Sequence, residues 1–259
     1  MPATHGIEYN VVPNGISILT VNRPEVSNAL DWEAMDAFGD VIERTRKNKE
    51  TRALIVTGHG DVFIAGGDLK ALAQYGKRKD GMRLSRLMGR TLRRMREMHC
   101  PTIAAINGPA RGGGAEIAVA CDIRVMAENA NIGFVHASLG IAPGWGGARY
   151  LLQLVGYSRA LELLATGRIV ASVEAREIGL SEYVVPAGKA LETAQEIATK
   201  IAVHPRQAIR AAKRLLRFAL ASPDAIRSEE RRLFAELWGS EYKSEAIERF
   251  LGGSKTKSE

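Results

Sequence analysis

Cysteine is scarce in this chain of 259 residues, which contains only Cys100 and Cys121. The two have neither the spacing of metal ligands nor the pattern of a disulfide framework, which fits a reducing compartment. No apolar stretch approaches the ~18 residues that a membrane span needs. The opening MPATHGIEYN lacks the basic and apolar segments of a secretion signal. We therefore expect a cytoplasmic enzyme or binding protein with no membrane contact.

Several catalytic and cofactor motifs are also missing. The segments GGGAEI, GWGGAR and GHGDVF all lack the last glycine of the dinucleotide-binding motif G-x-G-x-x-G. There is no P-loop motif and no G-x-S-x-G nucleophile elbow. No H-E-x-x-H occurs and no two histidines have ligand spacing, so we expect no metal site.

Acidic residues are few relative to basic ones, and the formal net charge is +7. Much of the excess lies in residues 77–96, which hold nine basic residues and one acid. Arg83, Arg86, Arg90 and Arg93 recur at helical spacing, opposite an apolar set. The pattern favours the solvated face of an amphipathic helix over a nucleic-acid stripe, and no nucleic-acid module accompanies it. We expect no specific nucleic-acid partner.

The order of patterns along the chain predicts an α/β protein. Residues 7–24 read as a hairpin around Asn14-Gly15, and Asp31 as the cap of an amphipathic helix. The segments RALIVT, TIAAIN and IRVMAE read as buried strands, with a helix starting near Leu69 after the first of them. Beyond about residue 190 the pattern is helical, including DAIRSEERRLFAELW and SEAIERFL, and the last residues, GGSKTKSE, are expected to fray.

Two glycine-rich loops each follow a buried strand and open a helix. They are AGGD at residues 65–68 and RGGGAE at residues 111–116. Glycine lets a backbone approach a ligand closely, and free N–H groups at a helix start attract negative charge. Two such loops side by side could aim two N–H donors at one oxygen and form an oxyanion hole. The alternative, that these glycines only make tight turns, stays open from the residues alone.

The chain resembles the enoyl-CoA hydratase/isomerase (crotonase) superfamily over nearly its whole length. The matching stretches occur in order and at the family's spacing: NRPEVSNAL, FIAGGDLKAL, AAINGPARGGGAEIAVACDIRVMAENANIGF, LGIAPGWGGARYLLQLVG and AREIGLSEYVV. The resemblance implies a crotonase-like spiral of ββα units in residues 1–195, which binds acyl-CoA. It also implies a C-terminal helical trimerisation region in residues 196–259, giving a homotrimer or a dimer of trimers. No cofactor is implied, because coenzyme A is part of the substrate.

The resemblance also assigns residues to the site. The oxyanion hole falls on the N–H groups of Gly67 and Gly113, which would hold the enolate oxygen of a thioester. The loop of Ala65, Gly66, Asp68, Leu69 and Lys70 would line the adenine and pantetheine site. Around the later glycine block, Pro143 and Trp145 would bind the substrate; Trp145 would press on the acyl chain, although it could equally cap the core.

Family hydratases use two glutamates to hold and activate one water. The first falls on Glu116, and the second should lie eight residues before Gly144, where this chain has His136. A carboxylate there would repel an acyl group that carries its own carboxylate, whereas histidine would pair with it. Glu116 and His136 are the expected catalytic residues.

The segments FVHASLGIAPGWGG and RRLFAELWG are more similar to the ethylmalonyl-CoA decarboxylase branch than to the two-glutamate hydratases. This favours a lyase that decarboxylates a short 2-alkylmalonyl-CoA of the ethylmalonyl or methylmalonyl type. The first alternative is enoyl-CoA hydration in fatty-acid or related metabolism, with Glu116 and His136 sharing the water. A non-catalytic acyl-CoA-binding protein is a further alternative.

Overall fold

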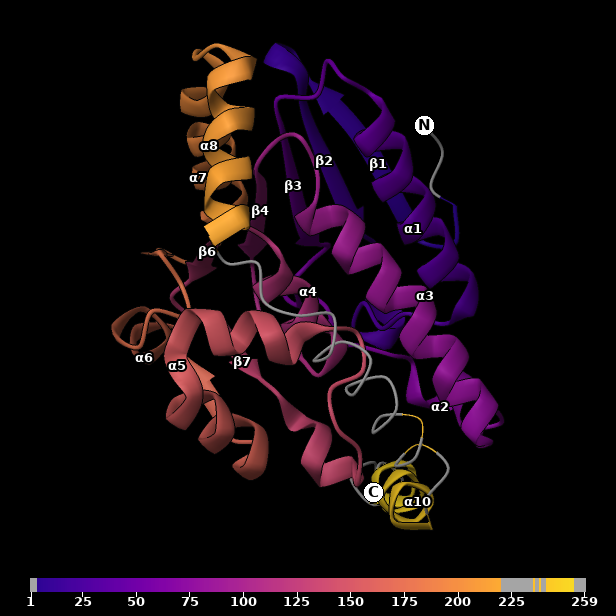
Figure 1. The fold of residues 1–259 in the computed structure, drawn as a ribbon. Helices are drawn as coiled ribbons and strands as arrows, with labels where there is room; N and C mark the ends of the chain where they lie inside the picture. Colours follow the sequence, from indigo (N-terminus) through magenta and orange to yellow (C-terminus); the bar gives the residue numbers. More distant parts are fainter. Residues whose placement is uncertain (1–3, 220–234, 236–237, 239–240, 254–259) are drawn as a thin grey trace.

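The computed structural model describes residues 4–219, 235, 238 and 241–253, and within them the fold is mixed α/β with two sheets. The larger sheet has the strand order β1-β2-β3-β4-β6-β9, in which only β1 and β2 are antiparallel (Figure 1). The smaller sheet has the order β5-β7-β8. The strands are β1 (Ile7–Val12), β2 (Ile16–Val21), β3 (Ala53–Gly58), β4 (Thr102–Ile106), β5 (Ala110–Arg111), β6 (Ile123–Ala127), β7 (Asn131–Gly133), β8 (Ile169–Ala171) and β9 (Tyr183–Val185).

The predicted hairpin is confirmed. Strands β1 and β2 pair from Ile7 opposite Val21 to Val12 opposite Ile16. The turn between them holds Asn14 and Gly15 at φ angles of 65° and 72°, a left-handed conformation that these two residue types tolerate. The predicted strands that follow are also present, and β3 and β4 are buried along their whole length.

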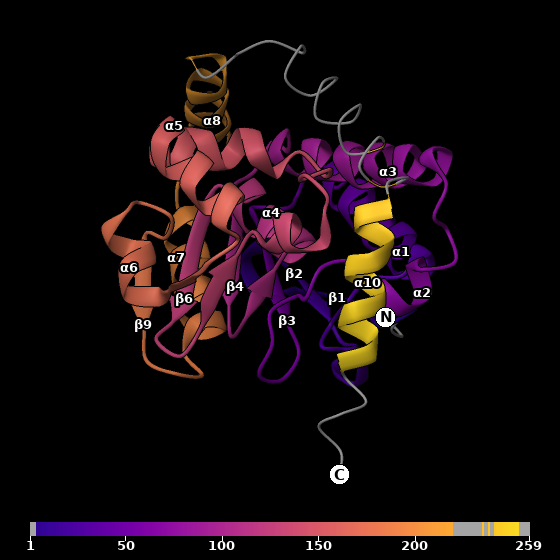
Figure 2. The ribbon, with the colours of Figure 1, turned by 90° about the horizontal axis from the view of Figure 1, so that it is seen from below.

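Helices cover both faces of the large sheet, as Figure 2 shows. Helix α7 (Ala190–Ala202) packs on β2, β3, β4 and β6 from one side. Helices α1 (Trp32–Lys47) and α3 (Arg78–Arg96) pack on each other on the opposite side, beside α4 (Gly113–Ala120) and α5 (Gly147–Thr166). The predicted cap of α1 is confirmed, because Asp31 Oδ1 accepts a hydrogen bond from Ala34 N at 2.8 Å.

Two strands followed by a helix recur along the chain, as β1–β2–α1, β4–β5–α4 and β6–β7–α5. This is the predicted spiral of ββα units. Because the helices start where strands end, the loops before α2 (Leu69–Leu72) and α4 meet at one edge of the sheet. The predicted boundary after residue 195 falls within α7, and the structure packs that whole helix on the sheet with the core.

Helix α3 carries the basic stripe. Its apolar face is buried through Leu84, Met88, Leu92 and Met95, as the amphipathic pattern predicts. On the outer face, the Arg83 guanidinium lies 4.4 Å from the centre of the Trp32 ring, and Arg93 pairs with Glu97. Some arginines of the stripe therefore contact neighbouring side chains of the same protein.

Helix α6 (Ser172–Glu177) precedes β9 and α7, and the C-terminal region contains α8 (Arg206–Ala219) and α10 (Glu241–Gly253). Most of the predicted helix DAIRSEERRLFAELW lies outside the described residues. Two of its residues, Ala235 and Trp238, are described, and both are helical and buried. Residues 254–259 of the tail expected to fray also lie outside the described residues. Among the described helices, none is both long and apolar enough to cross a membrane.

Candidate active site

The two glycine loops lie against each other. A parallel bridge joins Ile64 to Ala110, just before each loop. Gly66 has a φ of +97°, and a Cβ atom built on it would lie only 3.0 Å from the backbone N of Gly113. Glycine is required at this position both for its φ angle and for the close approach of the second loop. Two loops that are far apart in the sequence thus form one surface.

The N–H groups of Gly67 and Gly113 have no acceptor in the described part of the chain. Neighbouring N–H groups are engaged: Asp68 N donates to Leu30 O at 2.8 Å, and Gly112 N donates to Gly133 O at 2.9 Å. Neither Gly67 N nor Gly113 N donates to any described residue, and both glycines line a cavity of about 390 Å³. Gly113 is also the first residue of α4, where the helix dipole favours negative charge. This arrangement suits the binding of a negatively charged oxygen.

The ring of Trp145 packs against the backbone of both glycines. A Cβ on Gly113 would lie 2.2 Å from Trp145 Cζ3, and one on Gly67 would lie 3.9 Å from Cζ2. Trp145 is buried and lines the same cavity. Its ring therefore supports the two donors and forms part of the cavity wall.

Glu116 lies in the first turn of α4 and is 1% exposed. Its Oε1 accepts hydrogen bonds from Trp145 N and Gly147 N, both at 2.9 Å. Gly147 has no room for a side chain, because a Cβ there would lie 2.4 Å from Glu116 Cγ. One carboxylate oxygen thus holds the turn before α5, and the other, Oε2, lies against His136.

His136 is the second group of the site. It lies in the short 3-10 helix η3 (Val135–Leu139), is 5% exposed, and lines the cavity. Its Nε2 is 3.1 Å from Glu116 Oε2, and its buried Nδ1 has no hydrogen-bond partner among the described residues. A buried polar atom without a partner is costly, so this nitrogen calls for an explanation.

The structure brings together most of the expected site residues. Ala65 and Leu69 line the cavity with the two glycines, Trp145, Glu116 and His136. Gly66, Asp68, Lys70 and Pro143 are not among its lining residues. Asp68 instead caps α2, where its Oδ1 accepts from Lys70 N at 3.0 Å and Ala71 N at 3.1 Å. The contact of Gly66, Asp68, Lys70 and Pro143 with the substrate or its coenzyme A stays a prediction.

Trp238 and Arg111 are among the lining residues of the cavity that were not expected from the sequence. Trp238 lines it from the C-terminal region, its Nε1 donates to Tyr75 O at 2.6 Å, and its side chain packs on Gly81. The segment RRLFAELWG carried a signal for this residue, but nothing in the sequence places it 122 residues after Glu116 in the same wall.

Arg111 is the second of these residues. Its Nη1 donates to Ala110 O at 3.1 Å and to Asn131 O at 3.3 Å, and its Nη2 donates to Asn131 Oδ1. It forms no ion pair with a carboxylate among the described residues. Burial lowers the pKa of its guanidinium below the ordinary value. Its position directly before the glycine motif was the available signal.

The comparisons with known proteins agree with this geometry. The model of the enoyl-CoA hydratase/isomerase family matches residues 12–257. A short-chain-enoyl-CoA hydratase from Clostridium acetobutylicum is 34% identical over 91% of this chain and 91% of its own. The ethylmalonyl-CoA decarboxylase of Homo sapiens is 35% identical over 93% of this chain and 80% of its own.

A solved structure supports the same assignment. The enoyl-CoA hydratase of Bacillus anthracis superposes with a TM-score of 0.79 at 32% identity, covering 96% of each chain. The match of sequence and fold extends over nearly the whole chain. The chain belongs to the enoyl-CoA hydratase/isomerase (crotonase) family of acyl-CoA enzymes.

Proposed function

We propose that this enzyme decarboxylates a short 2-alkylmalonyl-CoA, such as ethylmalonyl-CoA or methylmalonyl-CoA. The bond between the α-carbon and the substrate carboxylate breaks, CO₂ leaves, and the electron pair passes into the thioester carbonyl to give an enolate. The N–H groups of Gly67 and Gly113 stabilise the charge on that oxygen. A proton from His136 or Glu116 then adds to the α-carbon and gives the saturated acyl-CoA.

The observation that carries this proposal is the buried Nδ1 of His136, a residue that lines the cavity; this atom has no hydrogen-bond partner among the described residues. Glu116 Oε2 accepts from the Nε2 side of the ring, so a protonated His136 would present a charged Nδ1–H donor to a substrate carboxylate. Arg111 adds a second cation to the wall, and Glu116 is the acid among the lining residues. The balance of charge suits an acyl group that carries a carboxylate.

Hydration of a 2-enoyl-CoA is the second candidate. The hydrogen bond between His136 and Glu116 favours it, because the two groups could hold one water and move its proton. A non-catalytic acyl-CoA-binding protein is the third candidate, and the buried, oriented carboxylate of Glu116 argues against it.

Product analysis separates these candidates. The enzyme is incubated separately with ethylmalonyl-CoA, methylmalonyl-CoA and crotonyl-CoA, and the thioesters are identified by mass spectrometry. We expect CO₂ release from a malonyl-type thioester, yielding butyryl-CoA or propionyl-CoA, with slow hydration of crotonyl-CoA. Rapid hydration with no decarboxylation would overturn the proposal and support the hydratase. No turnover of any thioester would support the binding protein.

Glu116 is expected to have two separable roles. In Glu116→Gln the amide oxygen still accepts from Trp145 N and Gly147 N, so the melting temperature should change little. Proton transfer is lost, and kcat should fall roughly 100- to 10,000-fold if Glu116 delivers the proton. Glu116→Ala leaves the two N–H groups unpaired and should destabilise the fold by about 1–3 kcal/mol. Thermal unfolding and kcat of both variants check this, and an unchanged kcat in Glu116→Gln would leave Glu116 only the role of holding the turn.

We propose that the chain forms a homotrimer or a dimer of trimers. Large apolar side chains are exposed on α5 and α6, including Tyr157 at 71% and Val173 at 64%. On α8, Leu216 is 67% exposed. Such surfaces are typical of faces that are buried between subunits. Light scattering at micromolar concentration should give three or six times the chain mass, and a monomeric mass would contradict the proposal.

The remaining expectations concern the cofactor and coenzyme A. We propose that the reaction needs no cofactor besides the coenzyme A of the substrate. Gly66, Asp68 and Lys70 would lie along its adenine and pantetheine part, outside the cavity that holds the acyl group. Pro143 is buried next to the turn that Glu116 holds, and would act on the acyl site through that turn.

A further inference from the structure

Two neighbouring hollows lie at the end of the large sheet opposite the active site. They have volumes of about 200 and 590 Å³ and share Lys49, His99 and Arg210 in their walls. Lys49 lies between α1 and β3, His99 lies between α3 and β4, and Arg210 lies on α8. The active-site loops follow β3 and β4, whereas Lys49 and His99 precede these two strands. The length of a strand therefore separates the two sites, which are about 20 Å apart. We call the two hollows together the basic pocket.

Positive charge in the basic pocket exceeds what the protein neutralises. Some cations have acidic partners: Arg206 pairs with Glu50 and Lys213 with Asp122. Three others, Lys49, Arg210 and Arg214, form no ion pair with any described residue. Glu97 also lines the larger hollow, but it pairs with Arg93 and Arg217. The remaining cations repel one another, and an anion in the hollow would relieve that repulsion.

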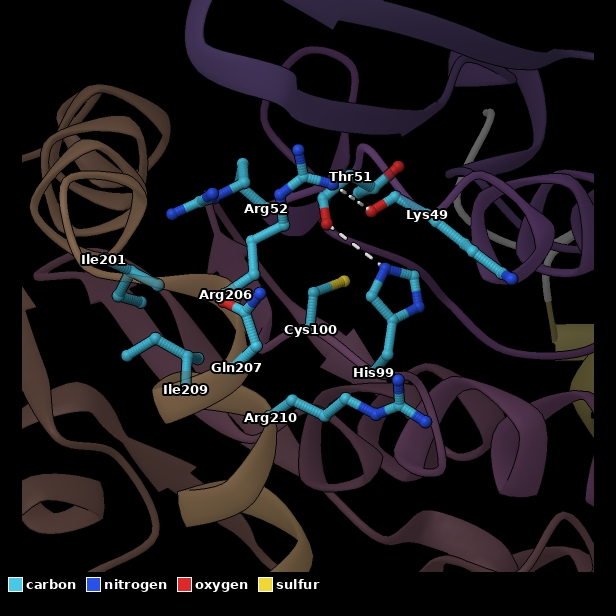
Figure 3. A pocket seen from close by; sticks show the side chains of 10 residues that line it. All are labelled: Lys49, Thr51, Arg52, His99, Cys100, Ile201, Arg206, Gln207, Ile209 and Arg210. Atoms are coloured by element: carbon cyan, nitrogen blue, oxygen red, sulfur yellow. Dashed lines mark hydrogen bonds between the residues drawn. The ribbon is translucent and has the colours of Figure 1, made fainter.

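The floor of the basic pocket contains a buried hydroxyl without a partner. Thr51 is 2% exposed, lines the smaller hollow, and its Oγ1 makes no hydrogen bond to any described residue. The backbone O of Thr51 lies 3.2 Å from His99 Nε2. In Figure 3 the His99 ring lies between the side chains of Lys49 and Arg210. A buried hydroxyl without a partner among the described residues thus lies at a hollow lined by cations.

One wall of the smaller hollow is apolar. Ile201 and Ile209 line it on the side away from His99, as Figure 3 shows. Helix α8 is fixed over the hollow, because Arg206 Nη1 donates to Lys49 O and Lys213 Nζ donates to Cys100 O, both at 2.8 Å. The cations therefore surround a concave site.

We propose that the basic pocket binds a small phosphate-rich ligand, with at least two phosphate groups, at a site separate from the acyl-CoA cavity. Phosphate oxygens would accept hydrogen bonds from Lys49, Arg210 and Arg214, and the Thr51 hydroxyl would donate one more. The apolar wall could receive a small non-polar part of the ligand, such as a nucleotide base. A concave site of this size favours a small molecule over a nucleic-acid duplex, which needs an extended surface.

The test uses inorganic pyrophosphate and ATP as probes in isothermal titration calorimetry at low salt. We expect both to bind, with affinity falling as salt rises. Tighter binding of ATP would show that the apolar wall takes the base, and equal binding would show that phosphate alone is recognised. The double variant Arg210→Gln/Arg214→Gln should weaken pyrophosphate binding roughly tenfold or more. Lys49→Gln, on a separate loop, should weaken it as well.

The control pair is Arg86→Gln/Arg90→Gln. These two arginines have the same spacing on a helix and are exposed, but they lie on α3 outside the pocket. Their replacement should leave pyrophosphate binding unchanged, and equal losses in both double variants would overturn the proposal. None of these variants should alter turnover of the acyl-CoA substrate.

His99 gives a local readout. Burial lowers its pKa, and the charges of Arg210, Lys213 and Arg206 lower it further. A bound phosphate would stabilise the charged imidazolium, so the pKa of His99 measured by NMR should rise with pyrophosphate. An unchanged His99 signal would overturn the site. The proposal would also be overturned if a DNA duplex bound more tightly than pyrophosphate and the Arg210→Gln/Arg214→Gln variant lost that DNA binding.

Discussion

Replacing His136 with alanine is expected to impair malonyl-type substrates selectively. The charge-assisted contact to the substrate carboxylate is worth about 1.5–3 kcal/mol, so kcat/KM for ethylmalonyl-CoA should fall roughly ten- to a hundredfold. Binding of an uncharged thioester such as butyryl-CoA should change much less. Steady-state kinetics and calorimetric titration of the two thioesters measure the difference.

His136→Gln is the matched control for this prediction. The glutamine amide can still donate to Glu116 Oε2, which His136→Ala leaves buried without that partner, but it carries no charge. If both variants lose malonyl-type turnover alike while butyryl-CoA still binds, the charge of His136 is responsible. If His136→Gln retains full decarboxylation, the role of His136 is only to hold Glu116.

His136→Glu is expected to be more damaging still to decarboxylation. The new carboxylate would lie close to Glu116 Oε2, now 3.1 Å from the histidine ring, and one of the two acids would have to take up a proton. It would also repel the substrate carboxylate. Because the change recreates a two-glutamate site, hydration of crotonyl-CoA should rise. A His136→Glu enzyme that still decarboxylates well would contradict the assigned role of the histidine.

Removing an oxyanion donor should slow the reaction more than the loss of His136 does. Gly113→Pro deletes an N–H that no described residue accepts, and a lost donor of this kind costs ~100- to 1000-fold in kcat. Proline is well tolerated in the first turn of a helix, where Gly113 lies, so the backbone should change little. The measurement is kcat at saturating substrate.

The new Cβ is a complication that a second variant resolves. A Cβ at residue 113 would lie 2.2 Å from Trp145 Cζ3 and must displace the ring. Gly113→Ala brings the same Cβ but keeps the N–H, so the ratio of the two kcat values isolates the donor. Butyryl-CoA binding should survive in both variants. Equal activity of Gly113→Pro and Gly113→Ala would remove Gly113 from the oxyanion hole, and Gly67→Pro with Gly67→Ala repeats the comparison at the other donor.

The local features of the fold could be predicted because each depends on neighbouring residues. Asn14-Gly15 specifies the left-handed turn of the hairpin, and the Asp31 side chain caps the helix that it precedes. The site residues could be located because a glycine loop between a buried strand and a helix exposes backbone N–H groups, and because the resemblance supplied the spacing. Glu116 and His136 are hydrogen-bonded to each other as that spacing suggests.

The sequence by itself determined the family, the ββα order, the two glycine loops and the change of a carboxylate to His136, because these are properties of short segments and their order. Only the tertiary structure decided which distant side chains share a wall. It placed Arg111 and Trp238 in the cavity, tied Glu116 Oε1 to the turn before α5, and left His136 Nδ1 without a partner among the described residues. It also gathered Lys49, Arg210 and Arg214 in one pocket. Such contacts depend on how the chain returns to the sheet after long excursions, and no local pattern of residues specifies that path.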